Sequence, residues 1–84
     1  MKITEFIFRK MSRKGDECSA MTFPEMQMQL HNYLGMHSVA VKADAGEMIF
    51  IGNEFPRVME HINGLVQHEA ERIEVLLIPR ISGG

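Results

Sequence analysis

The sequence predicts a small α+β domain, with a four- to five-stranded mixed sheet and one main helix packed on one face. Three observations carry this prediction: strand-like segments at the start of the chain, one helical apolar face in the middle, and an unbroken apolar run near the end. Such a run is typical of a central strand that a helix covers. The 84 residues are enough for one domain.

The first two strands are expected at residues 2–9 and 17–22. Between them, residues 13–16 read Arg-Lys-Gly-Asp, and Gly15 can adopt the positive φ that a tight turn needs. The two strands are therefore predicted to form an antiparallel hairpin.

The main helix is predicted to start at Pro24, because proline suits the first helical position, and Thr22 or Phe23 can cap it. Its end is expected at Gly35. The apolar residues in this segment fall at helical spacing on one face, and they are Met26, Leu30, Tyr33 and Leu34.

A second hairpin is expected from residues 38–44 and 47–51, with Ala45-Gly46 at the turn. Residues 57–66 have apolar side chains at helical spacing, but Asn63-Gly64 interrupts them, so only a short helix is predicted there.

The final strand is expected at residues 72–78, where Pro79 ends it by removing a backbone donor. The predicted organisation is therefore a domain at 1–78 and a flexible tail at 79–84. Six extended residues reach roughly 20 Å, and Gly83-Gly84 makes the tip thin enough to enter a narrow tunnel of another protein.

This order of elements resembles the ubiquitin-like β-grasp fold, in which the closing strand lies parallel to the first. The last eleven residues, from Glu74 to Gly84, also resemble the ends of the sulfur-carrier proteins of molybdopterin and thiamine biosynthesis. Those proteins typically end in Pro-Pro-Val-Ser/Thr-Gly-Gly, and here Arg80 stands where the second proline is usual.

The resemblance implies a carrier protein rather than an enzyme. An adenylating enzyme of the ubiquitin-activating type would use ATP and magnesium to activate the Gly84 carboxylate, which a sulfur donor would convert to a thiocarboxylate for a sulfur-acceptor enzyme. Gly83, Ser82 and Arg80 would bind the activating enzyme as parts of the tail. The chain itself would bind no cofactor.

The family resemblance also implies that partners dock on the outer sheet face, with Met48 and Phe50 as the candidate surface. Because Met48, Ile49, Phe50 and Ile51 are all apolar, they place apolar groups on both faces of one strand. The alternative is that the 53–68 segment folds over this strand as a second layer.

Two other functions remain open. The same tail would serve a protein modifier that a conjugating enzyme joins to target lysines through Gly84. A non-catalytic interaction protein is the third possibility, since some phage tail-assembly proteins contain ubiquitin-like domains whose last strand runs into a stretch similar to Pro79-Arg80-Ile81.

Composition excludes several classes of function. The net charge of −2 argues against nucleic acid as the main partner. Cys18 is the single cysteine, so no internal disulfide forms, and a reducing, cytoplasmic location is expected. No apolar run is long enough to span a membrane. The four histidines lack metal-ligand spacing, so no metal site is predicted.

Overall fold

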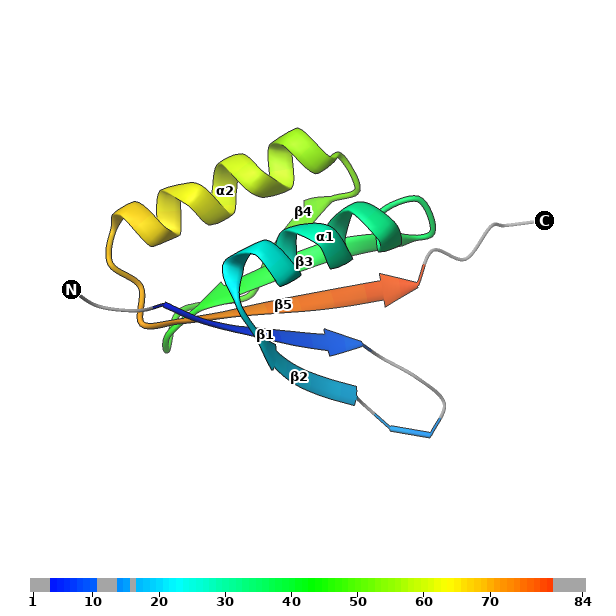
Figure 1. Cartoon of the computed structure of the whole chain (residues 1–84), viewed down its shortest axis with the longest axis horizontal. Coiled ribbons are helices and arrows are strands. Elements are labelled where there is room, and N and C mark those ends of the chain that lie inside the picture. Colours follow the sequence, from blue (N-terminus) through cyan, green and yellow to red (C-terminus); the bar gives the residue numbers. More distant parts are fainter. Residues whose placement is uncertain (1–3, 11–13, 16, 80–84) are drawn as a thin grey trace.

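The computed structural model describes residues 4–10, 14–15 and 17–79. They form a small α+β structure in which two helices cover one face of a five-stranded mixed sheet (Figure 1). The strands lie in the order β2-β1-β5-β3-β4. This arrangement is compatible with a β-grasp-like fold.

The first hairpin forms as expected. Strands β1 (Glu5–Lys10) and β2 (Glu17–Met21) pair antiparallel, with Phe6 opposite Met21 and Lys10 opposite Glu17. Every residue of β2 remains exposed except Met21, because this strand forms an edge of the sheet. Phe6 and Phe8 of β1 are buried in the core.

Helix α1 (Phe23–Tyr33) begins one residue before the predicted Pro24 and ends two residues before the predicted Gly35, and Thr22, one of the two predicted caps, is its N-cap. The Thr22 hydroxyl accepts from the amide of Glu25, while the Thr22 amide donates to the Glu25 carboxylate at 3.1 Å. This reciprocal capping box satisfies donors that every helix start leaves open. Met26, Leu30 and Leu34 are buried and Tyr33 packs against the core, which confirms the predicted apolar face.

Strands β3 (His37–Ala43) and β4 (Ile49–Gly52) form the second hairpin, with a register shift between Val39 and Ala40. Val39 and Val41 are almost fully buried beneath the helices.

Helix α2 (Phe55–Gln67) corrects the expectation of one main helix and a short, interrupted one. It has 13 residues against 11 in α1, and it runs through Asn63-Gly64 without a break. Val58, Met59 and Ile62 are buried on its inner face. Burial of this face outweighs the low helix propensity of asparagine and glycine, because tertiary packing supplies most of the stability of a helix in a protein.

Strand β5 (Arg72–Pro79) lies at the centre of the sheet. It runs parallel to β1, with Phe6 opposite Ile73 and Phe8 opposite Val75, which confirms the predicted pairing of the last strand with the first. The other neighbour is β3, which runs antiparallel to β5. Ile73, Val75 and Leu77 have no exposed surface and form the middle of the core.

Pro79 is a small correction, since the sequence predicts the strand to stop at residue 78. The proline instead belongs to β5, opposite His37 of β3. A proline is tolerated at the end of a strand, where the loss of one amide donor costs little pairing.

Candidate functional site

The candidate site is the surface around the end of β5, because Ser82-Gly83-Gly84 follows this strand closely in the sequence. Its pairing with β1 and β3 holds it on both sides, and its side chains at alternate positions fill the core. The proposed tail residues Arg80, Ser82, Gly83 and Gly84 lie outside the described residues. What the structure describes is the surface around the end of β5.

Aromatic and cationic groups lie beside the last residues of β5. Lys10 is the register partner of Leu77, and its Nζ lies 5.1 Å from the centre of the Tyr33 ring. His37, the partner of Pro79, places its ring 5.4 Å from that of Tyr33, and its Nδ1 is 3.2 Å from the Tyr33 carbonyl oxygen. The end of β5 is therefore bordered by groups that can contact an anionic or aromatic partner surface.

The sheet face opposite the helices has an apolar patch, which we call the outer patch and define as Leu76, Ala40 and Phe50. Ala40 lies between the core residues Val39 and Val41 along β3, so its side chain points away from the helices. Leu76 and Phe50 are its register partners on β5 and β4, and directly opposed residues share a face.

Phe50 is 65% exposed and Met48 is 39% exposed. The alternative expectation is that the 53–68 segment covers β4. It is met on the helix-covered face of the sheet, where Ile51 packs against the core and α2 contacts β4. Of the two candidate surface residues, Phe50 thus has a defined place on the outer face.

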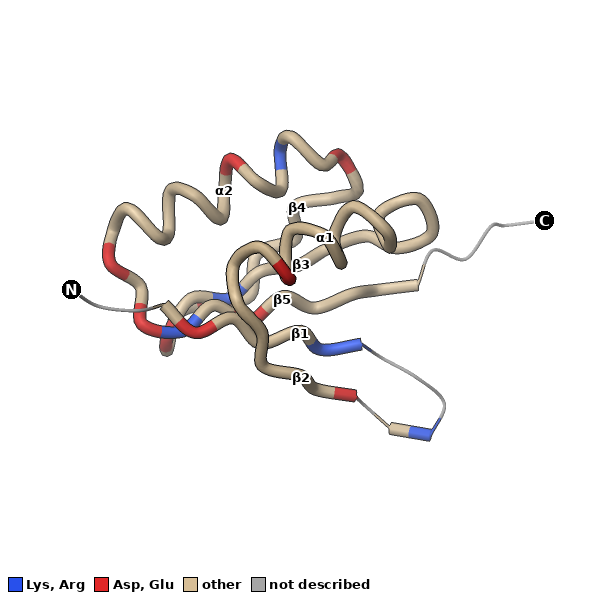
Figure 2. Tube along the Cα trace, viewed as in Figure 1, with Lys and Arg blue, Asp and Glu red and all other residues tan. Residues whose placement is uncertain are grey.

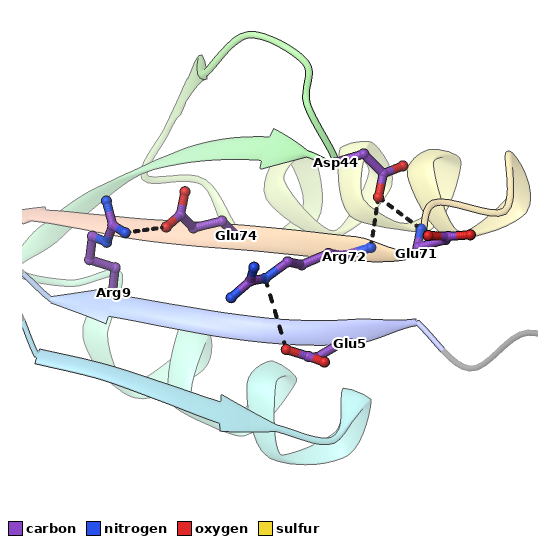
Figure 3. Close-up of polar contacts among 6 residues, drawn as sticks. All are labelled: Glu5, Arg9, Asp44, Glu71, Arg72 and Glu74. Carbon is purple, nitrogen blue, oxygen red and sulfur yellow. Dashed lines mark hydrogen bonds and ion pairs between the residues drawn. The ribbon is translucent and has the colours of Figure 1, made fainter.

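Charged residues gather around the start of β5 in the chain trace (Figure 2), and the close-up shows the contacts among six of them (Figure 3). Arg9 and Glu74 form an ion pair at 2.8 Å, and Arg72 lies 3.8 Å from Glu5. Because these side chains are partly or largely exposed, each pair contributes about 0–1 kcal/mol. Along the outer face of β5 the side chains thus change from charged Arg72 and Glu74 to apolar Leu76 and Ile78.

Asp44 ties the end of β3 to the start of β5 (Figure 3). Its carboxylate oxygen Oδ1 accepts from the amide of Arg72 at 2.9 Å and from the amide of Glu71 at 3.1 Å. Asp44 has a φ of 49°, a left-handed conformation that aspartate tolerates better than most residues. These contacts have a structural role, because they fix where β5 begins.

A groove of about 530 Å³ between β4 and α2 was not foreseen from the sequence. Its walls include Phe50 and Ile51 of β4 and, from α2 and its C-cap, Arg57, His61, Gly64 and His68. The helical spacing of residues 57–66 indicates the helical wall of this groove, although Asn63-Gly64 predicts an interruption there, but the position of that helix beside β4 has no signal in the sequence.

Within 4–10, 14–15 and 17–79, no three His, Cys, Asp or Glu side chains are placed to hold a metal ion. In the same part of the chain, no helix is both long and apolar enough to cross a membrane. Cys18 is exposed on the edge strand β2.

No protein-family model matches the chain, and comparison with curated proteins and with solved structures finds no significant match. The class that the fold defines is thus a small α+β protein with a five-stranded mixed sheet.

Proposed function

We propose that the chain is a ubiquitin-like carrier protein whose Gly84 carboxylate is adenylated by a partner enzyme and then carries sulfur as a thiocarboxylate. The observation that carries the proposal is the position of β5: this central strand, parallel to β1, ends at Pro79 and leads directly into Arg80-Ile81-Ser82-Gly83-Gly84. The proposal applies to a chain whose terminal residue is Gly84, and its test begins with that point.

The proposed chemistry uses a partner's catalytic groups and this chain's carboxylate. A carboxylate oxygen of Gly84 attacks the α-phosphorus of ATP, and pyrophosphate leaves. A hydrosulfide-type sulfur nucleophile then attacks the acyl carbon, and AMP leaves with the oxygen that joined it to the carbonyl. Glycines at 83 and 84 suit this chemistry because a residue without Cβ passes a narrow tunnel with little steric conflict.

The outer patch supports the proposal as a docking surface for the activating enzyme. The exposed Phe50 and, across Ala40 of β3, Leu76 place apolar area on the face reached by the strand that leads to the tail. Aromatic anchors of this kind commonly dominate the binding energy of interfaces.

The experiment is mass spectrometry of the chain purified from its native host. Trypsin cleaves after Arg80 and releases Ile81-Ser82-Gly83-Gly84, a peptide with neither methionine nor cysteine. A thiocarboxylate on this peptide is therefore not confused with oxidation of any of the eight methionines or with modification of Cys18. The proposal predicts that one oxygen of this peptide is replaced by sulfur.

The same digest tests the alternatives. If Ile81-Ser82-Gly83-Gly84 is found attached to lysines of other proteins, the chain is a modifier. If the peptide carries only an unmodified carboxylate, or if residues follow Gly84 in the mature chain, the carrier proposal is wrong and an interaction protein replaces it.

An activation assay then tests docking. With the native adenylating enzyme, deletion of Gly84 should abolish ATP–pyrophosphate exchange. Phe50→Ser should raise the KM for the chain and leave kcat nearly unchanged, because the patch contributes to binding and takes no part in the reaction at the Gly84 carboxylate. The matched control is Met28→Ser, since Met28 is 66% exposed on α1, on the other side of the sheet.

A further inference from the structure

We propose that the groove between β4 and α2 binds an extended acidic–apolar peptide segment of a partner protein, which pairs as an added strand with the free edge of β4. The groove shares Phe50 with the outer patch, but its other walls belong to α2, and the inference does not depend on the chemistry of the tail.

The edge of β4 is open to pairing. In the described part of the chain β4 pairs with β3 alone and is the outermost strand. Its sequence, Ile-Phe-Ile-Gly, has none of the charges or prolines that protect natural sheet edges from pairing. Ile49 is 49% exposed and Phe50 65% exposed. An apolar edge of this kind favours the addition of an extended peptide.

Gly64 opens the groove beside this edge. A Cβ added at Gly64 would meet no atom within 4 Å, so the space next to it is empty. Leu65 lines the same groove and supplies apolar surface. Glycine inside a helix destabilises it relative to alanine, and here it leaves room for an apolar side chain of a bound peptide.

The groove has the length of a short peptide. Its helical wall extends from Arg57 to His68, and at ~1.5 Å per residue this distance is about 16 Å. An extended peptide rises ~3.3 Å per residue, so about five residues fill it.

Hydrogen-bond donors indicate an acidic occupant. Arg57, His61 and His68, whose side chains can donate hydrogen bonds, line the groove, and Glu60 is its one acidic lining residue. Arg57 forms no ion pair with the described residues. The Nε2 atom of His61 is buried and finds no hydrogen-bond partner among them. A carboxylate entering the groove can accept hydrogen bonds from such groups, and hydrogen bonds with a charged partner are the stronger kind.

A second copy of the chain fits less well. In the antiparallel register centred on β4, Glu47 of one copy lies opposite Glu54 of the other, and directly opposed like charges destabilise a strand pair. We therefore assign the groove to a segment of another protein.

The test is selection of a phage-displayed random dodecapeptide library on the full chain, followed by fluorescence anisotropy with the enriched peptides. We expect enriched peptides to combine alternating apolar residues with Asp or Glu. Gly64→Met should fill the groove and weaken binding at least about tenfold. Asn63→Met is the matched control, because Asn63 is exposed and does not line the groove, and it should leave the affinity unchanged.

Circular dichroism should show the same fold for both variants, and peptide binding should shift the amide resonances of Ile49–Gly52. Deletion of Gly84 should not change the affinity, which separates this inference from the carrier proposal. Absence of enrichment, enrichment of basic peptides, or equal binding by Gly64→Met would overturn the inference. Self-association of the chain that Gly64→Met abolishes would assign the groove to a second copy instead.

Discussion

Replacing Leu30 by alanine should destabilise the protein strongly, because Leu30 has no exposed surface and lies on the inner face of α1, in the core. The change removes three carbon atoms, each worth about 0.8 kcal/mol of burial, or about 2.4 kcal/mol in total. The cavity left behind raises the expected loss to about 2–5 kcal/mol. At 0.05–0.15 kcal/mol per residue, a chain of this length has a net stability of about 4–13 kcal/mol, so the loss is a large share of the whole.

The assay is urea denaturation followed by far-ultraviolet circular dichroism. The midpoint should fall for Leu30→Ala while the slope stays unchanged, and the melting temperature should fall by at least about 10 °C. Met28→Ala on the same helix is the control, because Met28 is 66% exposed and its loss should change stability by no more than about 0.5 kcal/mol. Equal midpoints for Leu30→Ala and the wild-type chain would refute the assigned helix face.

Three further changes test local contacts. Asp44→Ala should lower the free energy of unfolding by about 0.5–1.5 kcal/mol, because two backbone amides lose their acceptor, whereas Asp44→Asn keeps an acceptor oxygen and should stay close to wild type in the same urea assay. The pKa of Glu25 lies below its ordinary value because the Thr22 amide, and next the Thr22 hydroxyl, donate to its carboxylate. Its charge therefore stabilises the helix start above the ordinary carboxyl pKa, and this contribution is lost as the pH falls through the lowered value, so midpoints of wild type and Glu25→Gln should differ at neutral pH and converge in acid. Gly64→Ala should raise stability by about 0.5–1 kcal/mol, since alanine favours a helix and its Cβ meets no atom there; a lower midpoint would contradict the open groove.

Sequence patterns predict those features of the fold that depend on nearby residues and on burial. The start of α1 follows from Thr22 and Pro24, and its buried face follows from the spacing of Met26, Leu30 and Leu34. The central place of β5 follows from an apolar run too long and continuous for an edge. These features depend on neighbouring residues and on burial, both of which leave a pattern in the sequence.

Features that depend on tertiary contacts were not accessible in the same way. Asn63-Gly64 has low helix propensity, and only the burial of Val58 and Ile62 keeps α2 continuous through it. Apolar residues on both faces of β4 left open which side Phe50 takes, and the register with Ala40 decides it. The groove beside Gly64 needs the position of α2 over the sheet, which no local pattern supplies.

The carrier proposal depends on transfer of sulfur to the Gly84 carboxylate. Its most direct test is the mass of the tryptic peptide Ile81-Ser82-Gly83-Gly84, from chain purified from its native host. We expect a peptide in which sulfur replaces one carboxylate oxygen, and we expect no thiocarboxylate on the shortened peptide Ile81-Ser82-Gly83 when Gly84 is deleted. A peptide found only with an ordinary carboxylate, under conditions in which the cognate adenylating enzyme is present and active, would contradict the carrier proposal.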